Sequence, residues 1–147
     1  MLLKLKLKFY GIKNYTINSN GTIDVNGDVD LRSRNLSKLP FTFGKVTGYF
    51  LCNYNNLTSL IGAPESVGKS FYCRNNKLTS LAGAPKSVGR NFGCDDNYLT
   101  TLFRAPESVG GDFWCDNNKR QLNGKPLTEK EVREVSNVEG NVYVYDN

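Results

Sequence analysis

The spacing of the cysteines constrains the fold of this chain more than any other feature. Successive cysteines are separated by 21 residues: Cys52, Cys73, Cys94 and Cys115. The same residue types recur around each of them, and in the second copy they are Val67, Phe71, Cys73, Asn76, Leu78, Leu81, Ala84 and Pro85. Such a period indicates a solenoid in which every repeat forms one turn of a coil. Because one turn alone buries too little apolar surface to offset its ordering entropy, the turns must stack.

The pattern within a repeat predicts where the strands lie. The alternation of Phe71 and Cys73 is typical of a strand with one buried face, whereas Leu78 and Leu81 point inward from the returning arc. Applied to the whole chain, the pattern predicts a mainly β solenoid with a parallel sheet of about six strands, near residues 28–32, 49–53, 70–74, 91–95, 112–116 and 141–145. We expect one domain over residues 1–147, with repeats at 28–123.

Both ends depart from the repeat and are predicted to be caps. In residues 1–27, LKLKLKFYG alternates leucine with lysine as an edge strand would, and YTINSNGTIDV predicts a β-hairpin that turns near Asn20 and Gly21. In residues 124–147, Thr128 and Glu131 form a capping-box pattern, and Leu127 and Val132 a hydrophobic staple. They predict a short helix at 129–136 that covers the core where Arg120 and Asn123 replace the two leucines, followed by a terminal strand.

The repeat resembles a known family. Asn-x-Leu-Thr-Ser-Leu at 55–60 and 76–81, each followed by a proline, is similar to the leucine-rich repeats of the short, 20–22-residue bacterial type. The chain also resembles small uncharacterised leucine-rich-repeat proteins of tailed bacteriophages, with Cys and Phe in strand positions that Leu or Ile usually fill. The resemblance covers residues 25–123. It implies a leucine-rich-repeat solenoid that binds a partner on its strand face.

The sequence contains few residues in patterns that are typical of catalytic or metal-binding sites. The chain has no histidine, the commonest side chain for acid–base catalysis and metal binding at neutral pH. The cysteines occur once per turn rather than in the close pairs of zinc sites, so we expect them to be reduced and to fill the core. A matching column of Asn55, Asn76, Asn97 and Asn118 is expected to satisfy backbone groups. Four carboxylates could form a cation site but lack calcium-loop spacing: Asp95, Asp96, Asp112 and Asp116. We expect no enzyme activity, cofactor or metal.

Charge and hydropathy bear on location and partners. The net charge is +5, and the first 20 residues contain four lysines and no acid, whereas the remainder is nearly neutral. No apolar run is long enough to cross a membrane, and no signal peptide precedes the repeats. We therefore expect a cytoplasmic protein, in the host cytoplasm if it is phage-encoded, without membrane contact. The lysines keep nucleic-acid binding open as the alternative function.

The outward strand positions predict the binding surface. The period places Leu51, Tyr72, Trp114 and Tyr143 in one column interrupted by Gly93. With the flanking positions, the candidate surface is Tyr49, Leu51, Tyr72, Arg74, Asp95, Trp114, Asp116, Tyr143 and Tyr145. Aromatic and arginine side chains with a charged rim are typical of protein interfaces, although the aromatic rings could also stack without function.

Two functional expectations follow from this surface. The first is a non-enzymatic protein-binding module, a phage or bacterial factor that binds and inhibits a host protein. The alternative is a nucleic-acid-binding protein that uses the aromatic column and the N-terminal lysines, and the aspartates beside the column make it less favoured. The terminal strand, NVYVYDN, would leave its backbone unpaired. We therefore also expect a weak homodimer through this edge, with Tyr143 and Tyr145 near the contact.

Overall fold

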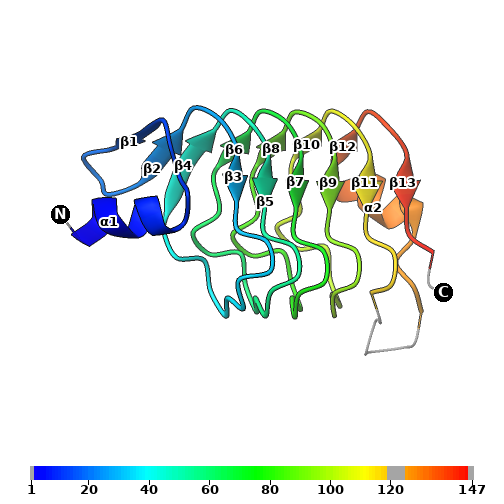
Figure 1. Cartoon of the computed structure of the whole chain (residues 1–147). Helices are drawn as coiled ribbons and strands as arrows, with labels where there is room; N and C mark the ends of the chain where they lie inside the picture. The colour runs from blue at the N-terminus through cyan, green and yellow to red at the C-terminus, as the bar shows by residue number, and fades with distance from the viewer. Residues whose placement is uncertain (1, 119–124, 146–147) are drawn as a thin grey trace.

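The computed structural model describes residues 2–118 and 125–145. The chain coils into a solenoid of stacked turns, with α1 (Leu2–Phe9) at one end and α2 (Glu129–Val135) near the other (Figure 1). Each turn contributes one short strand to each of two sheets. The six-stranded sheet contains β3 (Val29–Asp30), β5 (Phe50–Leu51), β7 (Phe71–Tyr72), β9 (Phe92–Gly93), β11 (Phe113–Trp114) and β13 (Val142–Tyr143). The seven-stranded sheet contains β1 (Tyr15–Ile17), β2 (Ile23–Val25), β4 (Phe43–Val46), β6 (Ser66–Val67), β8 (Ser87–Val88), β10 (Ser108–Val109) and β12 (Asn137–Val138).

The six-stranded sheet confirms the six predicted strands. Neighbouring strands are parallel and pair with a shift of one repeat, so that Phe71 lies opposite Phe50 on one side and Phe92 on the other. Each strand is two residues long, shorter than the alternation indicated. Backbone hydrogen bonds between turns continue beyond each strand, since the N–H groups of Cys73 and Asn75 donate to the carbonyl oxygens of Gly93 and Asp95.

The seven-stranded sheet was not predicted. Three of its strands, β6, β8 and β10, contain only a serine and a valine, which is too short to show a period of two. The chain then turns sharply towards the six-stranded sheet at a glycine. A Cβ atom at Gly89 would overlap the carbonyl oxygen of Gly68 in the preceding turn. The spacing of stacked turns therefore favours glycine at this corner.

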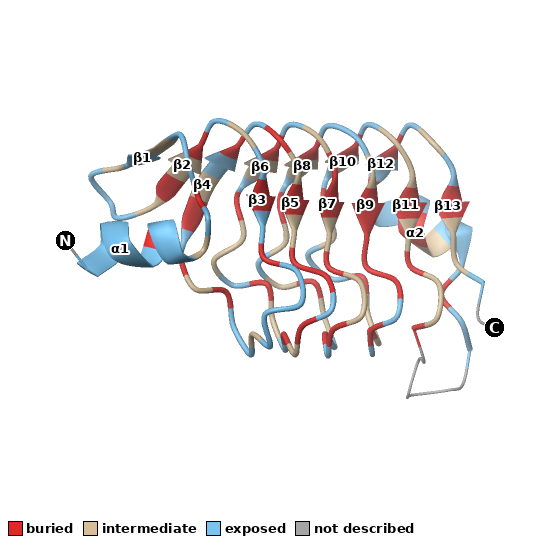
Figure 2. Cartoon of the chain, in the orientation of Figure 1, coloured by how far each residue is buried: buried red, intermediate tan, exposed pale blue. Residues whose placement is uncertain are grey.

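The core is a set of side-chain columns that run along the solenoid. The phenylalanine rings of successive turns stack, with centroids 5.2 Å apart for Phe50 and Phe71 and 5.6 Å for Phe71 and Phe92. The cysteines and the leucines of the returning arc are buried beside them. Figure 2 shows that every turn contains buried residues. The inward positions of the cysteines and leucines are as predicted.

The asparagine column has the backbone role that the sequence predicted. The side-chain amide of Asn76 donates to the carbonyl oxygens of Cys52 and Cys73, both at 3.0 Å, and its Oδ1 accepts from the backbone N–H of Leu57 at 3.0 Å. Asn97 repeats this arrangement one turn later. These amides satisfy backbone groups where the strand bends into the arc, and they tie adjacent turns together.

The N-terminal cap is partly different from the prediction. The hairpin of β1 and β2 is present, with Tyr15 opposite Val25. The expected edge strand in LKLKLKFYG is wrong, because these residues form α1. Leucine and lysine favour helices, and Leu3 and Leu7, four residues apart, share one helical face. Leu7 is completely buried, so contact with the end of the core selects the helix.

The C-terminal cap agrees with the prediction. α2 begins with the capping box, in which the Glu131 backbone N–H donates to Thr128 Oγ1 and the Glu131 carboxylate accepts from the Thr128 backbone. Leu127 and Val132 are buried in the core. The Arg133 guanidinium donates to the carbonyl oxygens of Val138 and Gly140, both at 2.9 Å, and so caps backbone acceptors of the last turn. Arg120 and Asn123 lie outside the described residues.

One position of the repeat has a left-handed backbone. Asn75 and Asp96 occupy it with φ of 53° and 54°, and Tyr54 occupies it with φ of 57°. Asparagine tolerates this conformation better than tyrosine. We expect Tyr54→Asn to raise the free energy of unfolding by about 0.5–1 kcal/mol, measured by urea denaturation. Tyr98→Asn, at an exposed tyrosine without positive φ, is the control, and an equal gain there would contradict this explanation.

Candidate functional site

The candidate surface follows the outward side chains of the six-stranded sheet. The strand register aligns five positions, which we call the aromatic column: Leu51, Tyr72, Gly93, Trp114 and Tyr143. The side chains of the column are half-buried rather than freely exposed. Of the other candidate residues, Tyr49, Arg74 and Asp116 are also half-buried, Asp95 is buried, and Tyr145 is exposed.

The strongest contact in the column joins its last two turns. The rings of Trp114 and Tyr143 are stacked, with centroids 3.8 Å apart and planes inclined by 13°. Parallel pairing of β11 and β13 places the two side chains on adjacent strands and on the same side of the sheet. The pair forms a rigid apolar platform with polar edges, a common feature of protein-binding surfaces.

Tyr72 is held in place by Arg74 in its own turn and by Asn91 and Gly93 in the next turn. Its ring leans over Gly93, where a Cβ atom would lie 2.7 Å from Tyr72 Cδ1. The Arg74 guanidinium lies 5.1 Å from the ring centroid, and Asn91 Nδ2 donates to the tyrosine hydroxyl at 3.2 Å. Gly93 is therefore more than a gap in the column, because it provides the room that orients Tyr72.

Tyr49 immediately precedes β5 and contacts two basic residues, Lys69 and Arg90, that the sequence did not identify as part of the surface. Arg90 donates to its hydroxyl at 3.2 Å, and Lys69 Nζ lies 5.3 Å from its ring centroid. Lys69 and Arg90 occupy equivalent positions in successive turns, at the corner between the two sheets. Their spacing of 21 residues is the signal in the sequence that relates them. The repeat pattern assigns residues at the corner to neither the inward nor the outward face, so it does not single them out.

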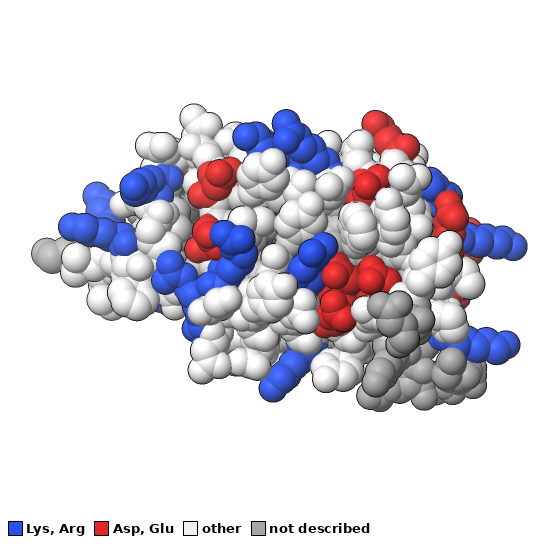
Figure 3. Space-filling model, turned by 45° about the vertical axis from the view of Figure 1, so that its right-hand side comes forward, with Lys and Arg blue, Asp and Glu red and all other residues white. Residues whose placement is uncertain are grey.

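Carboxylates border the aromatic column and gather on one face of the molecule (Figure 3). Arg74 Nε lies 3.3 Å from Asp95 Oδ1, which joins the two predicted residues in an ion pair. Burial raises the pKa of Asp95; the Arg74 charge opposes the shift, and the charges of Asp116 and Asp96 add to it. In the described part of the chain no group of acidic or cysteine side chains is arranged to hold a metal ion.

The raised pKa of Asp95 predicts how stability depends on pH. A carboxyl group whose folded pKa exceeds its unfolded value of about 3.9 makes the folded state less stable as pH rises through that interval. We therefore expect Asp95→Asn to raise the melting temperature near neutral pH, with the gain shrinking as pH falls through the folded pKa and absent below about 4. Thermal melts across this range test the effect. Glu134→Gln, on the exposed side of α2, is the control; a gain for Asp95→Asn that is independent of pH would argue against the ionisation of Asp95 as its cause.

The four cysteines are buried, and none of them forms a disulfide. Burial raises the pKa of the Cys52, Cys73 and Cys94 thiols. The Cys73 thiol donates weakly to the carbonyl oxygen of Gly93 at 3.4 Å. Protonated, enclosed thiols are poor nucleophiles and poor metal ligands. Their arrangement agrees with the predicted role in the core.

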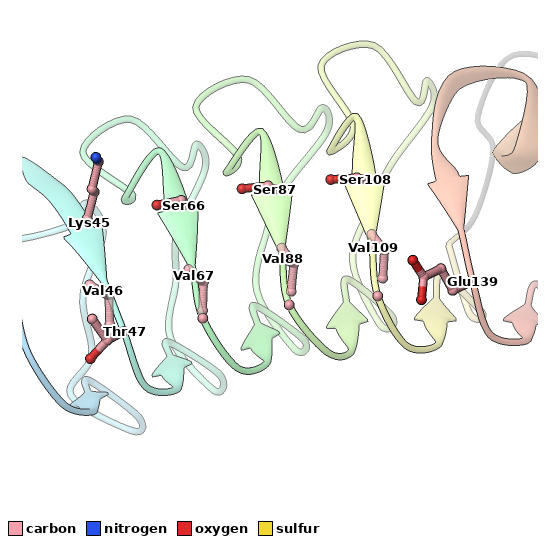
Figure 4. A pocket seen from close by; sticks show the side chains of 13 residues that line it. Lys45, Val46, Thr47, Ser66, Val67, Ser87, Val88, Ser108, Val109 and Glu139 are labelled. Carbon is pink, nitrogen blue, oxygen red and sulfur yellow. The ribbon is translucent and has the colours of Figure 1, made fainter.

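A second surface feature follows the seven-stranded sheet. A groove of about 570 Å³ runs across its strands, with Ser66, Ser87 and Ser108 on one side of the chain and the neighbouring valines on the other (Figure 4). Lys45 and Glu139 lie at its two ends. The side chains that line the groove are small, and the corner positions are glycines because a Cβ atom there would overlap the preceding turn. We assign it no function, since a row of small residues does not distinguish a site from a requirement of stacking.

The C-terminal edge of the six-stranded sheet and the helices bear on two further expectations, a dimer and membrane contact. Within the described residues β13 pairs only with β11, so its other edge is the end of the sheet. The expected dimer through this edge stays a prediction. None of the helices in residues 2–118 and 125–145 has the length and hydropathy needed to span a bilayer.

Comparisons with known proteins were made at the level of families, individual proteins and structures. No protein-family model matches the chain, and neither a curated protein nor a solved structure matches it. The residues of the solenoid itself therefore carry the evidence on function.

Proposed function

We propose that this protein is a non-enzymatic binding module that recognises another protein through the aromatic column and its border of charged side chains. The observation that carries the proposal is the prior ordering of the large side chains. Trp114 and Tyr143 stack on each other, and Arg74 and Asn91 hold Tyr72. Side chains fixed before binding lose little entropy on association, and tyrosine, tryptophan and arginine dominate binding energy in interfaces.

The leucine-rich-repeat family is part of the proposal. The Asn-x-Leu-x-x-Leu pattern and the buried asparagine amides support it, because they build each turn in the way the resemblance implies. The more specific role, a phage or bacterial factor that inhibits a host protein in the cytoplasm, rests on the resemblance alone. A rigid face on stacked turns fits this role because it could cover a surface of the host protein.

Nucleic-acid binding is the less favoured alternative. A groove for a single strand needs basic side chains beside its aromatic rings. Here the carboxylates of Asp95, Asp96 and Asp116 border the column, and Arg74 is already paired with Asp95. The phosphates of a bound strand would be repelled at this surface.

The test removes the two largest anchors of the column. We expect Tyr72→Ala/Trp114→Ala to weaken partner binding by at least about 2 kcal/mol, or about 30-fold. The partner is captured from bacterial lysate with the wild-type protein, identified by mass spectrometry and titrated calorimetrically. Tyr98→Ala/Phe103→Ala is the control, because both side chains are exposed aromatics outside the column.

The melting temperature of the column variant distinguishes a lost contact from a lost fold. We expect a modest decrease, because the variant loses the Trp114–Tyr143 stack and the contact of Tyr72 with Arg74. If the folded column variant binds its partner as tightly as wild type, the proposed surface is wrong. Capture of nucleic acid through the same residues would support the alternative instead.

A further inference from the structure

We propose that α1 binds the surface of anionic lipid membranes, with its axis parallel to the bilayer plane. This interaction surface is separate from the aromatic column and does not depend on the function proposed for that column. It departs from the expectation of no membrane contact, which rested on the lack of an apolar run long enough to cross a bilayer; binding at the bilayer surface needs no such run. As a helix rather than the expected edge strand, LKLKLKFYG also has a different distribution of apolar and basic side chains.

The first observation is an apolar stripe on the side of α1 that faces away from the solenoid. Leu2, Leu5 and Phe9 are 81%, 58% and 74% exposed, whereas Leu7 is completely buried. Residues two positions apart in a helix differ by about 200° around its axis, so Leu5 and Phe9 point away from the face that Leu7 buries. Leu2, Leu5 and Phe9 are three and four residues apart and share one side.

The second observation is the position of the lysines. Lys6 and Lys8 are each one residue from Leu7, which places them about 100° to either side of it, between the buried face and the outward stripe. Lys4 and Lys13 add to the same charge, and the first acidic residue of the chain is Asp24. All four lysines are exposed, and basic side chains gather at this end of the molecule (Figure 3).

The surface beside α1 also combines apolar and basic side chains. A groove of about 580 Å³ lies between α1 and the first turns of the solenoid, and its lining includes Leu3, Ile61, Lys6 and Lys38. Lys6 also donates to the carbonyl oxygen of Pro40 at 2.9 Å, which fixes α1 against the solenoid. Apolar and basic side chains therefore extend from the helix onto the neighbouring turns.

This arrangement favours a lipid surface over other occupants. An apolar stripe bordered by lysines matches the acyl chains and anionic headgroups of a membrane interface. A second copy of α1 would bring two sets of lysines together, which is electrostatically unfavourable. Nucleic acid would contact the outermost side chains, and these are leucine and phenylalanine rather than lysine. Eight residues extend about 12 Å, so α1 can lie in the interface but cannot cross the bilayer.

Vesicle flotation of the full chain tests the proposal. We expect binding to vesicles of equal parts phosphatidylglycerol and phosphatidylcholine, little binding to phosphatidylcholine alone, and release at high salt. Leu5→Ser/Phe9→Ser should lower the partition coefficient about tenfold. The matched control is Phe103→Ser/Val135→Ser, which removes two exposed apolar side chains at the other end of the solenoid. Circular dichroism verifies that each variant is folded.

A second pair of variants tests the contribution of the lysines of α1 separately from that of its apolar side chains. Lys4→Gln/Lys8→Gln should also lower binding to anionic vesicles about tenfold, whereas Lys77→Gln/Lys130→Gln, with the same change in net charge, should leave it unchanged. The proposal is overturned if anionic vesicles bind no better than neutral ones, or if the Leu5→Ser/Phe9→Ser variant binds like wild type. It is also overturned if vesicles fail to bind while α1 instead mediates a dimer in sedimentation or retains single-stranded DNA.

Discussion

Replacing Cys73 by aspartate is expected to lower the free energy of unfolding by about 3–5 kcal/mol. Cys73 is completely buried, with Cys52 and Cys94 in the equivalent positions of the adjacent turns. A carboxylate there would be removed from water without a cation beside it, because Arg74 is already paired with Asp95. Urea denaturation monitored by circular dichroism measures the loss.

Cys73→Val separates burial of a charge from loss of the thiol. Valine is apolar and similar in size, so we expect a change of less than about 1.5 kcal/mol. Native-state labelling with a thiol reagent supplies an independent check, since buried, protonated cysteines should react only as the protein opens. An aspartate variant as stable as the valine variant, or immediate labelling of all four thiols, would be incompatible with the inward cysteine column.

Replacing Asn76 by leucine is expected to cost about 3 kcal/mol or more. The substitution keeps the approximate size of the side chain but removes its three 3.0 Å hydrogen bonds to Leu57, Cys52 and Cys73. It leaves one backbone donor and two backbone acceptors buried without this partner. Because these groups belong to different turns, the loss should weaken the stacking as well as the turn itself.

The matched control for Asn76→Leu is Asn141→Leu, at an exposed asparagine in the last turn. We expect the control to change stability by less than about 0.5 kcal/mol. Chemical denaturation of both variants compares the two sites. Equal effects would mean that the leucine side chain itself, and not the loss of the Asn76 hydrogen bonds, determines the change.

The repeat could be predicted because its consequences are local and occur many times. A cysteine, an asparagine and two leucines at fixed offsets define which side chains point inward, and three nearly identical copies remove most of the ambiguity. The capping box of α2 was equally clear, since Thr128 and Glu131 interact with backbone groups only three residues away. Such signals depend on neighbours along the chain and need no knowledge of distant contacts.

The candidate surface was predicted as a column but not in its details. The period placed Tyr72 and Trp114 on the same side of the sheet, and the strand register agrees. It did not indicate that Tyr72 would lean over Gly93, because that orientation depends on Arg74 in its own turn and on Asn91 in the next. Side-chain direction on a sheet is decided by contacts between turns, which a linear period does not contain.

The coil, its inward columns and the position of its outward face follow from the 21-residue period, because equivalent side chains stack when each turn repeats the same residues. Contacts between turns, which the period does not contain, determine the structure of the corners and of the N-terminal end. The corner glycines reflect the approach of neighbouring backbones, and the strands before them are too short to carry a pattern. LKLKLKF fits a period of two and a helical face equally well. Burial of Leu7 against the end of the core selected the helix, and this leaves Leu5 and Phe9 facing outward.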